Sequence, residues 1–419
     1  MKLNQIKGIL QKLKVIKDYA AIAVPIIIAV IAVVMFIPTT VLQRNLAGSV
    51  QKNSAEKLNI INSLRDVPSE RQPLEEMKKE AALKSDANSI ALMTNKSSKR
   101  ELIAFGIFPR PAEVSQQVFN RFAKNWSSKY ESWMQVLKAR GGPTSAELSN
   151  SLKKNVVAEE IENATSFSTT EKLIIDDLCD KIARETGVYY EATALAMYRF
   201  WGKYAYTEFE TAIEDCWYGQ LGYWIIEDCL QTVKVMNKGA TNVLEANVKR
   251  IMDVGFGAQE TATNDYSMIR NMQATMMTVK DMPKYVTSMD SGLAMPLSAR
   301  ICDTKIDVVH FRIAVVVKAR EAGTFMEELC RSKEHKFRGF NNEMEKEETY
   351  RHNQITILKC NMGAVNVEDK EHRLYRYGDE ATVKLELLCE YVFDKDGYDE
   401  IKPGSVKAKL EGLLQKAAL

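Results

Sequence analysis

One uncharged stretch near the N-terminus constrains this chain more than any other feature. From Tyr19 to Gln43 the sequence has no charged residue, and it begins "YAAIAVPIIIAVIAVVMFIPTT". A helix needs about 20 apolar residues to cross a bilayer. A cleaved secretory signal has a shorter apolar region and a small-residue cleavage site, which "FIPTTVLQRN" does not offer. We therefore expect an uncleaved transmembrane helix over 19–38.

The charges beside this stretch predict its orientation. Five lysines precede it, whereas only Arg44 and Lys52 follow it closely. The positive-inside rule then places the N-terminus in the cytoplasm. Residues 1–18 have apolar side chains at helical spacing with lysines between them, as in a basic helix that lies on the inner leaflet; a docking helix for a cytoplasmic partner is the alternative. We expect an inner-membrane protein whose bulk is periplasmic.

A narrow apolar stripe follows the predicted span. Its members recur in steps of three, four or a multiple, which is typical of a helix that pairs with one partner helix in a short coiled coil. Pro68 and Pro73 should end this helix, and "LKSDANSIALMTNKSSKR" should be a polar linker. Residues 39–100 are thus a predicted membrane-proximal helix and linker. The predicted pairing residues are Leu42, Leu46, Val50, Leu58, Ile61 and Leu64.

The segment 101–240 has helical periodicity. Pro111 suits the first position of a helix, and apolar side chains recur after it at helical spacing. Ser168 and Glu171 have the capping-box spacing before another apolar stripe. The longest helix is expected over about 191–237. Residues 101–240 are therefore predicted to form a helical domain.

The second half of that longest helix contains "CWYGQLGYWIIEDCLQTVKVMN". Trp217, Leu221 and Trp224 fall on one helical face, and Asp228 follows one turn later. Aromatic side chains at this spacing indicate a buried core rather than a ligand site. The carboxylate of Asp228 is expected to be solvated or to cap a helix.

The last third of the chain changes to a period of two. "VVHFRIAVVVK" and "ATVKLELLCEYVF" alternate apolar with polar side chains, and "VKRIMDVGF" and "ITILKCNM" are two further strand candidates. "AREAGTFMEELCRS" between them has helical spacing. One apolar and one polar face are typical of an antiparallel sheet covered by helices on one side. The fold class is therefore α+β, with a ferredoxin-like domain over 241–419.

Composition and motifs argue against several classes of function. Lys+Arg and Asp+Glu are balanced at 57 and 55, so nothing supports nucleic-acid binding. The sequence contains no P-loop, no G-x-S-x-G and no H-E-x-x-H pattern. Its seven cysteines and four histidines lack the spacing of metal ligands. We predict no catalytic, cofactor-binding or metal-ligating residues and no small-molecule substrate.

One pair of cysteines is a candidate for a disulfide. Cys360 and Cys389 lie on the apolar faces of neighbouring strand candidates, and a disulfide is possible in the periplasm if the register is suitable. An odd number of cysteines cannot all pair within one chain. Buried free thiols are the ordinary alternative.

The order of anchor, "VLQRNLAGSVQKNSAEKLNIINSL" and sheet module resembles the PilO and PilN type of bitopic inner-membrane proteins. These proteins belong to type IV pilus and type II secretion machines. The likeness also includes "WYGQLGYWIIEDCLQTVKVMN…VLEANVKRIMDVGF", whereas 101–240 is an insert that short PilO proteins lack. It implies a non-enzymatic scaffold that forms homo- or hetero-oligomers with other platform proteins at the lipid bilayer.

Two other functions stay open. The first is a membrane-anchored extracytoplasmic sensor or ligand-binding protein, although the predicted cytoplasmic segment is short for a signalling output. The second is a membrane-anchored hydrolase, which would need a nucleophile and a base brought together by the fold.

Overall fold

The computed structural model describes residues 20–65, 72–96, 99–153, 168–257, 280–295, 298–341, 345–352 and 354–417. These residues divide into two compact units, Met1–Asn88 and Ser89–Leu419. The chain mixes α-helices with a six-stranded and a two-stranded sheet. The predicted α+β class is therefore confirmed.

The described residues of the first unit are helical. Helix α2 (Ala20–Arg65) contains most of the predicted span and the predicted pairing stripe, and α3 (Gln72–Lys96) follows it. The prediction of a polar linker up to residue 100 was wrong, because α3 continues to Lys96. Pro73 occupies the second position of α3, where proline is tolerated because the first turn needs no amide donor.

Within the described part of the chain, no helix has both the length and the apolar character that a membrane crossing requires. Of the predicted span 19–38, the structure describes the helical backbone from Ala20 onward but few of the side chains, and Tyr19 lies outside the described residues. The predicted amphipathic segment, 1–18, also lies outside the described residues.

The second unit is built around the six-stranded sheet, whose order is β1-β2-β3-β4-β8-β7. Strands β3, β4, β8 and β7 form an antiparallel series, whereas β1 and β2 are two short strands that continue the sheet beyond β3 in parallel pairing. Strands β5 and β6 form a separate antiparallel pair. The strands are β1 (Ala139–Arg140), β2 (Val188–Tyr189), β3 (Val248–Gly255), β4 (Ile306–Lys318), β5 (Lys333–Phe337), β6 (Glu348–His352), β7 (Ile355–Ala364) and β8 (Thr382–Asp394).

The predicted alternation along β8 is confirmed except at Glu390, which was expected on the polar face and is buried, with its carboxylate bonded to Ser298 and Arg300. Leu385, Cys389 and Tyr391 are fully buried on one face, whereas Lys384 and Glu386 on the other face are partly exposed. Each buried side chain removes apolar surface from water, which is the main force that holds such a sheet against its helices.

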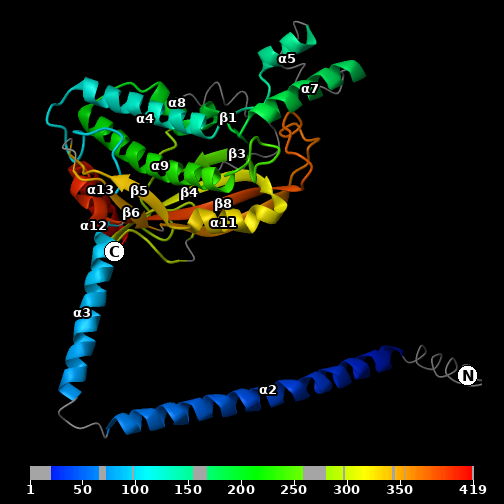
Figure 1. Ribbon diagram of the computed structural model, residues 1–419, viewed down its shortest axis with the longest axis vertical. Coiled ribbons are helices and arrows are strands. Elements are labelled where there is room, and N and C mark those ends of the chain that lie inside the picture. The colour runs from blue at the N-terminus through cyan, green and yellow to red at the C-terminus, as the bar shows by residue number, and fades with distance from the viewer. Residues whose placement is uncertain are drawn as a thin grey trace, which may run out of the picture. The chain divides into compact units, whose positions relative to one another are not determined.

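Helices α9 (Phe209–Met236) and α11 (Ala322–Cys330) contact each other and the sheet. Helix α4 (Gln116–Val136) lies beside α9 (Figure 1) and also contacts α8 (Ala196–Gly202). One hydrophobic core joins these helices to the sheet. The segments 101–240 and 241–419 therefore share a core. Among the described residues, the remaining helices are α5 (Ser145–Leu152), α7 (Thr169–Glu185), α12 (Lys395–Tyr398) and α13 (Gly404–Ala417), with single 3-10 turns at Ala192–Ala194, Ala319–Glu321 and Asp399–Ile401.

Local signals predicted some helix ends and missed others. The capping box of Ser168 and Glu171 is present at the start of α7. The first helix after Pro111 begins later than predicted, at Gln116, because the Ser115 side chain accepts from a backbone amide there. The long helix predicted over 191–237 is broken after Gly202, the last residue of α8, and resumes at α9.

Candidate functional site

The predicted pairing stripe is solvent-exposed on α2. Leu42 is 73% exposed and Leu46 is 67% exposed, and Val50 and Leu58 are more than half exposed. The side chains of the other two predicted members, Ile61 and Leu64, are outside the described set. All described residues of α2 from 41 to 60 are exposed, so these large apolar side chains are accessible to another helix or a similar apolar partner.

The aromatic face of α9 is core, as predicted. Trp217 stacks on Tyr398 at 5.7 Å between ring centroids, and its indole donates to the Tyr285 hydroxyl. The indole of Trp224 donates to the carbonyl of Glu101. Both indole donors are therefore satisfied inside the protein, as buried tryptophans require.

The prediction for Asp228 was wrong, because its side chain is buried in a charged cluster. The Arg100 guanidinium donates to Asp228 at 3.0 Å, to Glu227 at 2.5 Å and to the Tyr391 hydroxyl at 2.9 Å. Tyr391 in turn donates to Asp228 at 2.7 Å. The partner of Asp228 lies 128 positions earlier in the chain, so no local pattern could have indicated it. This cluster joins α9 and β8 to the segment that precedes α4.

His335 brings the small β5–β6 sheet to the same carboxylate. Its Nε2 atom lies 3.1 Å from Asp228 Oδ1. Lys333, two residues earlier, donates to the carbonyls of Glu328 and Leu329 at the end of α11. Burial lowers the pKa of the Lys333 ammonium. These contacts attach the small sheet to α9 and α11, which is a structural role.

A second buried cluster lies at the start of β4, close to the strand pair of Val309 and Tyr391. Asp307 accepts from the Tyr398 hydroxyl and from the Lys402 ammonium, and all three side chains are buried. The Lys402 ammonium also lies 5.1 Å from the Tyr398 ring centroid. Oδ2 of this carboxylate is therefore paired with both a cation and a hydroxyl, which offsets the cost of burying its charge. It links β4 to the C-terminal helices.

The structure does not bring the cysteines or histidines into one site. Strands β7 and β8 are neighbours, but the register places Cys360 opposite Leu387 and Cys389 opposite Ile357. Diagonal neighbours are too far apart for an unstrained disulfide, and both cysteines are free thiols. Across the residues that the structure describes, no group of histidines, cysteines and carboxylates could hold a metal ion.

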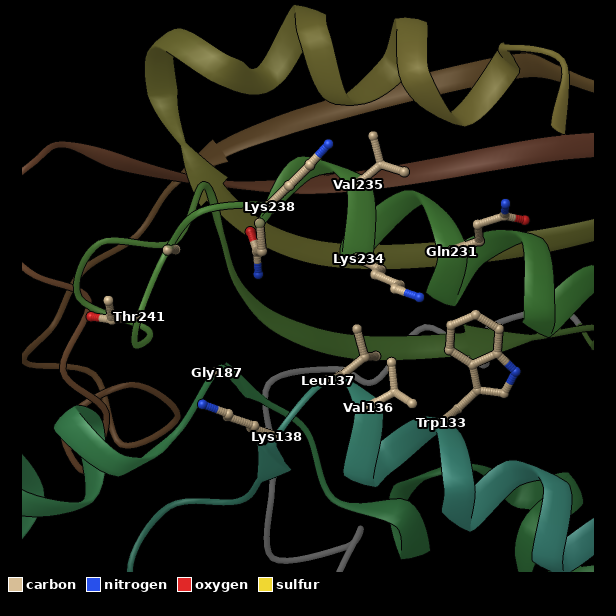
Figure 2. A pocket seen from close by; sticks show the side chains of 12 residues that line it. Trp133, Val136, Leu137, Lys138, Gly187, Gln231, Lys234, Val235, Lys238 and Thr241 are labelled. Atoms are coloured by element: carbon tan, nitrogen blue, oxygen red, sulfur yellow. The ribbon is translucent and has the colours of Figure 1, made fainter. Parts of the chain in front are cut away.

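A cavity of about 530 Å³ lies between the C-terminal ends of α4 and α9 (Figure 2). Trp133 and Leu137 provide an apolar wall, and Lys138, Lys234 and Lys238 contribute three ammonium groups. The lining contains no carboxylate. The Lys234 ammonium lies 5.8 Å from the Trp133 ring centroid. This composition suits an anionic ligand with an apolar or aromatic part.

The arrangement of these lysines also has a structural explanation. Lys234 precedes the end of α9 at Met236, and Lys138 and Lys238 each follow the last residue of their helix by two positions. Cations at helix C-termini are stabilised by the helix dipole. Figure 2 shows the three ammonium groups pointing in different directions rather than toward one point. The cavity therefore has a basic rim rather than a convergent anion site.

The chain matches no family model, no curated protein and no solved structure.

Proposed function

We propose that this chain is a non-enzymatic, bitopic inner-membrane scaffold of a type IV pilus or type II secretion-like platform. It would act through periplasmic protein–protein contacts. The observation that carries the proposal is the exposed apolar stripe on α2, which lies in the same continuous helix as the uncharged residues 20–43. A membrane-anchored rod with an exposed stripe is suited to side-by-side assembly within one membrane.

The topology of the second unit supports a ferredoxin-like assignment. The order β3-β4-β8-β7, antiparallel throughout, is the strand order of that fold. The helices also correspond, since α9 precedes β3 and α11 connects β4 to β7. The chain order differs, because α9 and β3 come before β4 rather than after β8. This domain presents sheet and helix surfaces and is a suitable platform for protein contacts.

The test is co-purification of the full chain from detergent-extracted membranes. Recovery of pilus or secretion platform proteins with it is the expected result. A variant with Leu42, Leu46 and Val50 all changed to Asn should lose that recovery, because the stripe becomes polar while the helix surface is otherwise unaltered. The matched control changes the neighbouring Gln43, Asn45 and Gln51 to Ala. A monomer that carries a bound small molecule, or that turns over a substrate, contradicts the proposal.

A ligand-binding function is the second candidate, and the basic cavity beside Trp133 favours it. Changing Lys234 and Lys238 to Ala should then abolish the binding of small carboxylates and phosphates, measured by calorimetry on the purified chain. Changing Lys124 and Lys129, which lie on α4 outside the cavity lining, is the matched control. Binding that is unchanged in the first variant removes the cavity as its site.

A further inference from the structure

The six-stranded sheet has two unlike edges. One edge is β1, which has only two residues. The other is β7, which has ten residues and pairs only with β8 among the described strands. Residues 359–364 of β7 are exposed. A strand of this length at an open edge presents a row of unpaired backbone groups that can bind another strand.

The exposed part of β7 lacks the usual protection of an edge. Natural edges are blocked by charges, prolines, bulges or very short strands. The irregularity between Ile357 and Lys359, and the charge of Lys359, lie at the start of the exposed part. The next five residues, 360–364, have neither a charge nor a proline. Met362 is 60% exposed, and a Cβ atom added at Gly363 would meet no other atom within 4 Å.

The register with β8 shows which side chains share a face of this edge. Cys360 and Met362 lie opposite Leu387 and Leu385, on the face that the helices cover. Lys359 and Asn361 lie opposite Leu388 and Glu386 on the other face. The edge thus has an apolar, sulfur-containing row on one side and a polar row on the other.

We propose that β7 pairs with β7 of a second copy of this chain, antiparallel and with the two Asn361 residues opposite each other. Two-fold symmetry about Asn361 puts Cys360 opposite Met362 of the second copy, and Lys359 opposite Gly363 of the second copy. Opposite residues of an antiparallel pair share a face, so the apolar row meets itself. Gly363 leaves room for the long side chain of Lys359.

Charge disfavours the register centred on Lys359, and rows that match themselves across the two-fold axis favour a second copy as the occupant. Like charges directly opposite each other destabilise a sheet, so a register centred on Lys359 is disfavoured because two ammonium groups would face each other. In the register centred on Asn361 the only charge of the segment faces glycine. In this register the apolar row of β7 meets the apolar row of the second copy and the polar row meets the polar row, so the pairing needs no other protein.

The proposal rests on the proposed function, because a shared membrane would concentrate the copies in one orientation. It names the surface and the partner that the proposed function leaves open. The two ideas fail separately. If platform proteins co-purify but β7 does not pair, only the edge proposal falls. If β7 pairs and no platform protein is recovered, the proposed function falls instead.

The test is disulfide trapping of the full chain in its membrane. In a Cys360→Ser background, Asn361→Cys should give a disulfide-linked dimer on mild oxidation, because facing residues of an antiparallel pair have Cα separations within disulfide range. Lys359→Cys and Gly363→Cys should give much less, since neither faces its own counterpart. The control is Leu173→Cys on α7, a position that is 64% exposed. If the Asn361→Cys variant forms no more disulfide-linked dimer than the Leu173→Cys variant, the proposal is overturned.

A charge on the edge provides an independent measurement. Met362→Lys puts two new ammonium groups beside the apolar row, and the dimer fraction of the Asn361→Cys protein should fall to the level of the Leu173→Cys control. The position is exposed, so the folded chain should keep its circular dichroism and melting temperature. Met362→Leu, which retains the apolar row, should leave dimer formation intact. Equal trapping in the two variants contradicts the proposal.

Discussion

Arg100 and Asp228 form a buried ion pair, with Nη1 of the arginine 3.0 Å from Oδ2 of the aspartate. Their side chains are 1% and 2% exposed. Removing one partner of such a pair leaves an uncompensated buried charge, which costs more than the pair itself contributes. The fold of the second unit therefore depends on Arg100, which lies between the end of α3 and the start of α4.

Arg100→Ala should lower the free energy of unfolding by about 3–5 kcal/mol, since Asp228 and Glu227 would keep buried or half-buried charge without their cation. Urea denaturation followed by tryptophan fluorescence measures this directly. Arg121→Ala, at an exposed position on α4, is the matched control and should change stability by less than about 0.5 kcal/mol. Equal effects of the two substitutions contradict the role given to the cluster.

His310 should make the protein less stable in mild acid. Burial lowers the pKa of its imidazole below 6.5, although Glu390 on the neighbouring strand opposes this shift. The unfolded chain then binds a proton that the folded chain does not, so stability falls as the pH drops below 6.5. The neutral ring also accepts from the Leu293 amide at 3.0 Å through Nδ1.

The measurement is the denaturation midpoint between pH 7.5 and 5.5 for the wild-type chain and for His310→Asn. Asparagine keeps an acceptor for the Leu293 amide but cannot be protonated, so the variant should have the flatter profile. Identical profiles would assign the acid sensitivity to other groups, among them His372, whose pKa is also lowered by burial.

The thiols of β7 and β8 should differ sharply in reactivity. Cys360 is exposed, whereas Cys389 is fully buried and burial raises the pKa of its thiol well above the ordinary value. Reactivity requires the thiolate and access to it. Mass mapping after brief alkylation of the reduced native chain should find Cys360 modified and Cys389 unmodified. In denaturant both thiols should react. Similar reaction rates of Cys360 and Cys389 in the native chain would contradict the burial of Cys389.

Gly187 is required by a close approach of two backbones. A Cβ atom there would lie 2.4 Å from the Leu137 carbonyl oxygen, and the Gly187 amide donates to the Lys138 carbonyl at 2.9 Å. Gly187→Ala should therefore cost about 1–3 kcal/mol of folding free energy, as overpacking does. Thermal unfolding measures it against Gly202→Ala, where a Cβ meets no atom within 4 Å. That control should be neutral or slightly stabilising because alanine favours helix.

Local patterns predicted the elements whose determinants are close in sequence. The alternation in "ATVKLELLCEYVF" and the pair Ser168 and Glu171 contain all that is needed for β8 and for the start of α7. Pro73 was assigned to the wrong end of a helix, because proline ends one helix and begins another equally well.

Long-range partners could not be predicted in the same way. Asp228 has the same sequence signature as a solvated carboxylate, and only the approach of Arg100 and Tyr391 makes it a core residue. The basic cavity was missed for a similar reason. Its lysines come from two helices whose ends meet only in the folded chain. The exposed edge of β7 depends on the strand order, which the hydrophobic pattern does not contain.

Helix α9 belongs by sequence to the helical half of the chain and by packing to the sheet. Residues 101–240 and 241–419 are therefore not independent modules, because each contributes part of one shared core. A fragment that begins at residue 241 would leave the apolar face of β3, β4 and β8 without its longest covering helix. A boundary for recombination or for a truncated protein therefore has to lie before the sheet and the helices that cover it, and not between them.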